Sequence, residues 1–94
     1  MKLIDIRKIN ENEFVVTVTK ETVTKHDVFV SEDTFNKYSN GKLTKEQLLK
    51  KSFLFLLQRE DQTMILKTFD LSEIANYFPE YVNIANLGWI DVSG

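Results

Sequence analysis

The run from Leu48 to Leu57 constrains this chain more than any other stretch, because it carries a dense set of leucine and phenylalanine side chains. From Lys45 to Glu60 the sequence has no glycine, proline or β-branched residue, a composition that favours a helix. Thr44 and Gln47 fit a capping box, in which each side chain binds the backbone N–H of the other residue. We therefore predict a long helix that begins after Thr44 and ends at about Glu60.

The apolar side chains cover a wide arc of this helix. At about 100° per residue, Leu49 and Phe53 share one face, whereas Leu54 and Phe55 lie to either side of it. Either the helix is buried within one domain, between a sheet and the C-terminal segment, or it presents a second face with Leu54 and Phe55 to another chain. A membrane span is excluded, because the uninterrupted apolar run covers only Phe53–Leu57 and a span needs about 20 residues.

Composition limits the other possibilities. The 94 residues form a single domain, 1–94, with 43% hydrophobic and 28% charged residues, as in soluble globular proteins. The net charge is −2, and no segment is basic enough to indicate nucleic-acid binding on its own. The absence of cysteine excludes a disulfide scaffold, cysteine metal ligands and cysteine catalysis. Residues 1–8 carry charges where a signal peptide has an apolar run, so we expect a cytoplasmic protein.

Three segments in the first third of the chain have the pattern of strands. Lys2–Ile9 alternates apolar and charged residues over part of its length, and Phe14–Lys20 alternates throughout. Val23–Val30 is rich in β-branched and aromatic residues. Short connections between these segments favour an antiparallel meander. The side chains that share a face are Phe14, Val16 and Val18 on the second strand and His26, Val28 and Val30 on the third.

Shorter helices are expected on both sides of the long one. Ser31, followed by two acidic residues, is an N-cap signal, and Gly41 suits a helix end or a turn. Asp70 or Ser72 caps another short helix, which Pro79 ends. These signals place helical turns before and after the central helix.

Two segments near the C-terminus are less clearly patterned. Thr63–Phe69 fits either an extended segment or a helical turn, and Trp89–Val92 fits an edge strand. The sequence as a whole predicts an α+β fold. It consists of a three-stranded antiparallel meander, with a C-terminal strand as an optional fourth, packed on one long helix with short flanking helices.

Several short motifs occur in order between Val28 and Tyr81. They are Ser52-Phe53-Leu54-Phe55-Leu56-Leu57-Gln58-Arg59-Glu60, Ile65-Leu66, Phe69-Asp70-Leu71-Ser72 and Tyr77-Phe78-Pro79-Glu80-Tyr81. In these motifs the chain resembles a family of small uncharacterised prokaryotic proteins, which have a β-rich N-terminal half and the pattern S-F-x-F-L-L-x-R-E, I-L, F-D-L-S and Y-F-P-E-Y. The resemblance implies no activity, ligand or catalytic residue, and the segment after Tyr81 lies outside the pattern.

No group of residues has the pattern of a reactive centre. His26 is the only histidine, and the neighbouring Asp27 points to the opposite face of a strand. A helix N-terminus explains the acidic pair Glu32-Asp33, and a solvated helix end explains Glu60-Asp61, so neither indicates a metal site. The glycines are too scattered for a phosphate loop. We expect no catalytic, metal-binding or cofactor-binding residue and no enzyme activity.

Two clusters are candidate binding surfaces. One is a lysine patch, which is either a solvated helix face or a basic surface for nucleic acid or an acidic partner; arginine, on which base readout usually relies, is nearly absent. The other contains aromatic residues around the only proline, which either cap the core or form an interaction surface. The lysine patch comprises Lys37, Lys42, Lys45, Lys50 and Lys51, and the possible interaction surface comprises Leu54, Phe55, Phe78, Tyr81 and Trp89.

These observations favour a small cytoplasmic, non-enzymatic protein that interacts with or regulates others by protein binding, with a protein partner or a second copy in a homodimer. The wide apolar arc of the central helix, in a chain without a reactive centre, motivates this hypothesis. Two alternatives stay open. One is nucleic-acid binding through the lysine patch, and the other is a small-molecule or peptide site lined by Phe78, Tyr81 and Trp89.

Overall fold

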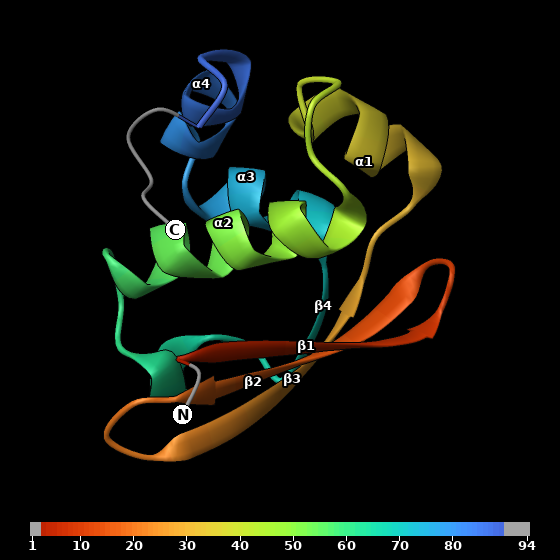
Figure 1. The fold of residues 1–94 in the computed structure, drawn as a ribbon. Helices are drawn as coiled ribbons and strands as arrows, with labels where there is room; N and C mark the ends of the chain where they lie inside the picture. Colours follow the sequence, from red (N-terminus) through yellow and green to blue (C-terminus); the bar gives the residue numbers. More distant parts are fainter. Residues whose placement is uncertain (1–2, 90–94) are drawn as a thin grey trace.

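The computed structural model describes residues 3–89 of the chain. Its sheet has the strand order β1-β2-β3-β4. The strands β1 (Ile4–Asn10), β2 (Glu13–Thr19) and β3 (Val23–Phe29) are antiparallel, and β4 (Thr68–Asp70) is parallel to β3. The α-helices lie together on one face of this sheet (Figure 1). The predicted α+β fold, with a three-stranded meander, is therefore confirmed.

The fourth strand is not the one expected at the C-terminus. It arises from the ambiguous segment Thr63–Phe69 and its surroundings, which divide into a 3-10 turn, η1 (Gln62–Met64), and the short strand β4. Of Trp89–Val92, only Trp89 lies within the described residues. Its φ of 65° is left-handed rather than extended, because it follows the end of a helix.

The remaining elements of the described chain are helical. The longest is α2, which the sequence predicted around Leu48–Leu57. The helices are α1 (Glu32–Tyr38), α2 (Lys45–Leu57), α3 (Ile74–Tyr77) and α4 (Glu80–Asn86), with a 3-10 turn, η2 (Leu71–Glu73), before α3.

The predicted helix starts are confirmed by their hydrogen bonds. Thr44 and Gln47 form the capping box, with distances of 3.1 Å from Gln47 N to Thr44 Oγ1 and 2.9 Å from Thr44 N to Gln47 Oε1. Ser31 Oγ accepts from the N–H of Thr34 at 3.2 Å. The helix end near Glu60 is wrong, because α2 stops at Leu57, where backbone bonds tighten the chain into a final turn.

Helix α2 lies between two layers, which explains its wide apolar arc. On the sheet side, the ring of Phe53 lies 5.4 Å from that of His26. On the other side, the ring of Phe55 lies 5.3 Å from Tyr81 on α4. Both phenylalanines are fully buried. A single chain therefore accounts for both sides of the helix, which is the first of the two interpretations of the sequence.

Pro79 begins a helix instead of only ending one. α3 stops at Tyr77, and α4 starts directly after the proline, whose fixed φ suits the first residues of a helix. α4 carries Tyr81 into the core, where its ring meets that of Trp89 at 5.2 Å. The indole N–H of Trp89 donates to the Tyr38 carbonyl (2.9 Å), so α1 and the end of α4 are joined.

Candidate functional site

A groove opens beside the C-terminal end of α2, where this helix faces β4 and α3. Its volume is about 190 Å³. The walls come from the end of α2, the segment after η1, β4 and the η2–α3 turn, and we call it the acidic groove. It is lined by Leu56, Glu60, Met64, Ile65, Leu66, Phe69, Glu73, Ile74, Tyr77 and Phe78.

The acidic groove has a buried apolar floor and an exposed apolar rim. Phe69 and Ile74 belong to the core and form part of the floor. Met64 is 68% exposed and Tyr77 is 65% exposed, and Leu66 is also exposed. Single exposed apolar side chains are common on protein surfaces. Several that lie together around one concavity instead indicate a binding site.

Two carboxylates add negative charge to this apolar surface. Burial raises the pKa of Glu60 above its ordinary value of 4.5. Within residues 3–89 the Glu60 carboxylate has no hydrogen bond and no ion pair. Glu73 Oε2 accepts from the N–H of Asp70 at 2.8 Å, which leaves its other oxygen for a ligand. A half-buried carboxylate without a partner is stabilised by any cation that enters the groove.

Arg59 does not neutralise Glu60, although the two residues are adjacent in sequence. The Arg59 guanidinium lies over the ring of Phe55, 3.8 Å from its centroid. Its Nε donates to Glu80 at 3.1 Å, and Nη1 donates to the Phe55 carbonyl at 3.3 Å. The arginine is therefore held against α4, and the acidic groove keeps its negative charge.

A buried polar network fixes the rim of the groove to the sheet. His26 Nδ1 lies 2.8 Å from the carbonyl of Leu66 and must carry the hydrogen, because a carbonyl only accepts. Its Nε2 then accepts from Thr24 Oγ1 at 2.9 Å. Gln62 Nε2 donates to Thr24 Oγ1 at 3.1 Å and to the carbonyl of Val18 at 3.2 Å. His26 therefore has a structural role, and its bond to Leu66 positions one edge of the groove.

The structure separates the residues that the sequence grouped as a possible interaction surface. Phe55, Tyr81 and Trp89 are buried in the core, and for these three the core role replaces the surface role. Phe78 is half-buried and lines the acidic groove. Leu54 is also half-buried, but it lies on the other side of α2, in a second groove beside β1.

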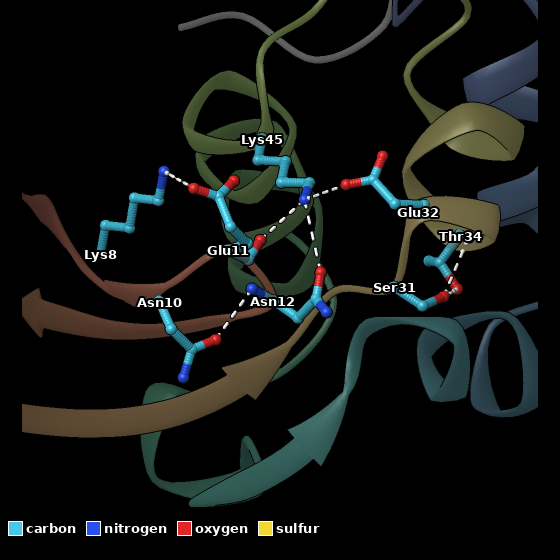
Figure 2. A network of polar contacts seen from close by, with 8 residues as sticks. All are labelled: Lys8, Asn10, Glu11, Asn12, Ser31, Glu32, Thr34 and Lys45. Carbon is cyan, nitrogen blue, oxygen red and sulfur yellow. Dashed lines mark hydrogen bonds and ion pairs between the residues drawn. The ribbon is translucent and has the colours of Figure 1, made fainter.

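The lysine patch is interrupted at its centre. Lys45 Nζ lies 2.6 Å from Glu32 and donates to the Glu11 carbonyl at 2.7 Å, so it joins α2 to the β1–β2 turn and to α1 (Figure 2). Its side chain is 13% exposed. Lys37 lies over the ring of Tyr38, 5.4 Å from its centroid. Lys42 and Lys50 are exposed and Lys51 is half-buried, so the five lysines differ in exposure, and the charge of Lys45 is paired.

Sequence reasoning missed most of the acidic groove. Glu60 was assigned to a solvated helix end, and the ambiguity of Thr63–Phe69 concealed that Met64 and Leu66 point outward. The only available signal was the apolar run Met64-Ile65-Leu66 without strand or helix periodicity.

Among residues 3–89, no three histidine or acidic side chains lie close enough together to hold a metal ion.

Comparisons with known proteins found no relative of this chain. A scan against models of protein families, a search of curated proteins and a search of solved structures each found no match. The resemblance to a family of small prokaryotic proteins stays a prediction. No helix within residues 3–89 has the length and apolar character needed to span a bilayer.

Proposed function

We propose that this chain is a small, non-enzymatic cytoplasmic protein that binds a partner protein through the acidic groove. The observation that carries the proposal is the half-buried Glu60 carboxylate, which has no partner in residues 3–89 and lies beside an exposed apolar rim. The occupant we propose is a partner segment in which a lysine or arginine is flanked by apolar residues.

The size of the groove favours a side chain over a free metabolite. Pockets for drug-sized ligands usually have volumes of about 300 Å³ or more, and this groove has about 190 Å³. A lysine or arginine fits such a space well, because its aliphatic stem covers apolar surface while its charged end stays in a polar environment. The stem would lie over Phe69 and Ile74, with the charge between Glu60 and Glu73.

The charges of the groove select a cation. Binding a cation at Glu60 removes the penalty that burial imposes on its charged form. The net charge of −2 adds a weak attraction for basic segments. Nucleic acid carries the opposite charge to the one this site attracts, and Lys45, at the centre of the lysine patch, is already paired with Glu32. Protein binding is therefore better supported than the nucleic-acid alternative.

The test is a selection of random heptapeptides on the full chain, compared with a selection on Glu60→Gln/Glu73→Gln. Wild type should enrich peptides in which lysine or arginine is flanked by apolar residues, and the double variant should not. A peptide enriched on wild type should bind Glu60→Gln about tenfold more weakly, because a charged hydrogen bond contributes roughly 1.5–3 kcal/mol.

Glu21→Gln is the matched control, because Glu21 is exposed in the β2–β3 turn and does not line the groove. It should bind the selected peptides as wild type does. Equal enrichment on wild type and on the double variant, or enrichment of acidic peptides, would show that the acidic groove is not the binding site.

A further inference from the structure

The strand β1 leaves one edge of the sheet open. It is the first strand in the order and pairs only with β2 (Figure 1). The bond from Thr19 N to the Leu3 carbonyl (2.9 Å) shows that the odd-numbered residues of β1 bond to β2. The backbone groups of Ile4, Ile6 and Lys8 therefore point away from the sheet. Within residues 3–89 nothing binds them.

An antiparallel copy of β1 can satisfy these groups only in a few registers, since outward-pointing residues must lie opposite each other. In the register with Ile6 opposite Ile6, Asp5 lies opposite Arg7 of the second copy on both sides of the centre. The next register in one direction places Asp5 opposite Asp5, and the next in the other direction places Arg7 opposite Arg7. Like charges directly opposite destabilise a pair of strands, so the charges of β1 favour the register about Ile6 over its two neighbours.

Apolar residues complement the same register. Leu3, which is 41% exposed, reaches the end of the second copy's β1, where the exposed Ile9 lies. On the helix side, a groove between β1 and α2 runs along Ile4 and Ile6 and is lined by the half-buried Leu54. Pairing would cover Ile6 and bring a second chain against this groove. The register therefore buries apolar surface while it pairs opposite charges.

We propose that the chain forms a twofold homodimer in which the β1 strands pair antiparallel about Ile6, which joins the two sheets into one. The backbone irregularity between Lys8 and Asn10 ends the regular pairing at Ile9. Each copy uses its β1 once, so the assembly closes as a dimer. The acidic groove involves the opposite edge of the sheet, through Phe69 of β4, and stays open in this dimer.

The experiment measures the mass of the full chain by sedimentation equilibrium over a range of concentrations. Wild type should dimerise with increasing concentration. Asp5→Arg places like charges opposite each other at both symmetric positions, as does Arg7→Asp, so each variant should weaken dimerisation about tenfold or more. Both residues are exposed, and circular dichroism checks that each variant keeps the fold.

Mixing the Asp5→Arg chain with the Arg7→Asp chain is the decisive experiment. The Asp5→Arg chain then presents two positive charges to two negative charges of the Arg7→Asp chain, so a heterodimer should form with an affinity close to that of wild type. The double variant Asp5→Arg/Arg7→Asp should also dimerise, and Glu21→Arg is the exposed control that should change nothing.

A wild-type monomer at every concentration would overturn the proposal. So would single reversals that leave the dimer intact, or mixed variants that do not associate. These outcomes are independent of peptide binding by the acidic groove, which a monomer would retain.

Discussion

Acidification should destabilise the fold through His26. Burial lowers the pKa of this histidine below its ordinary value of 6.5. The unfolded chain therefore takes up a proton near pH 6.5, whereas the folded chain resists protonation until the pH is lower. The contribution of neutral His26 is complete above pH 6.5 and is lost progressively as the pH falls below that value.

The hydrogen bonds explain why protonation is resisted. A proton on Nε2 turns an acceptor into a donor, but Thr24 Oγ1 now donates to that nitrogen and already accepts from Gln62. The threonine hydroxyl would lose its acceptor inside the protein. A proton bound only by the unfolded chain costs at most about 1.4 kcal/mol for each pH unit below the ordinary pKa of 6.5. Only one of the two units between pH 7.5 and 5.5 lies below that value, so the upper limit for the loss is about 1.4 kcal/mol.

Urea unfolding at pH 7.5, 6.5 and 5.5, followed by Trp89 fluorescence, measures this loss. The comparison is with His26→Gln, which keeps a polar side chain that does not titrate. Glu60 has the opposite pH dependence, because its raised pKa lets the folded chain bind the proton first, but it contributes equally to both proteins. His26 is the only histidine, so the difference between the two profiles is its own. An equal loss of unfolding free energy on acidification in wild type and in His26→Gln would show that His26 does not cause it.

Two further predictions concern the free energy of unfolding. Tyr81→Phe removes a buried bond to Ser52 (2.8 Å between the hydroxyl oxygens) and should cost about 1 kcal/mol, while Ser52→Ala/Tyr81→Phe should cost less than the two single changes added. Additive costs in urea titrations would mean that the bond contributes nothing. Glu60→Gln should stabilise the chain more at pH 7 than at pH 4, because protonation of the wild-type carboxyl removes its buried charge as the pH falls. An equal effect at both values would show that burial of the charge is not the cause.

Features that depend on a few neighbouring residues were predicted correctly from the sequence. The capping box at Thr44, the N-cap at Ser31 and the alternation of β2 are determined within a few residues, so they could be recognised without knowing the fold. Pro79 was correctly predicted to end one helix, but the helix that follows it was not predicted, because a proline that ends one helix can equally begin the next. The parallel strand β4 was missed because its pairing with β3 joins residues far apart in the chain, and its own sequence has no strand period.

The candidate site could be predicted only in part. Phe78 was singled out, but Glu60, Met64 and Leu66 acquire their roles from tertiary contacts that bring the end of α2 beside β4. The burial of Phe55 and Tyr81 was also undetermined, since a wide apolar arc fits equally a helix covered by its own chain and one covered by another.

The long connection from β3 to β4 implies that parts of the molecule fold at different times. The pairs within β1, β2 and β3 are local, whereas β4 can pair only after the intervening helices have closed a long loop. We expect the hairpins to form first and the short strand to dock late and open first. The open edge of β1 would then exist before the acidic groove does. The dimer that we propose would therefore form before the proposed binding groove is complete.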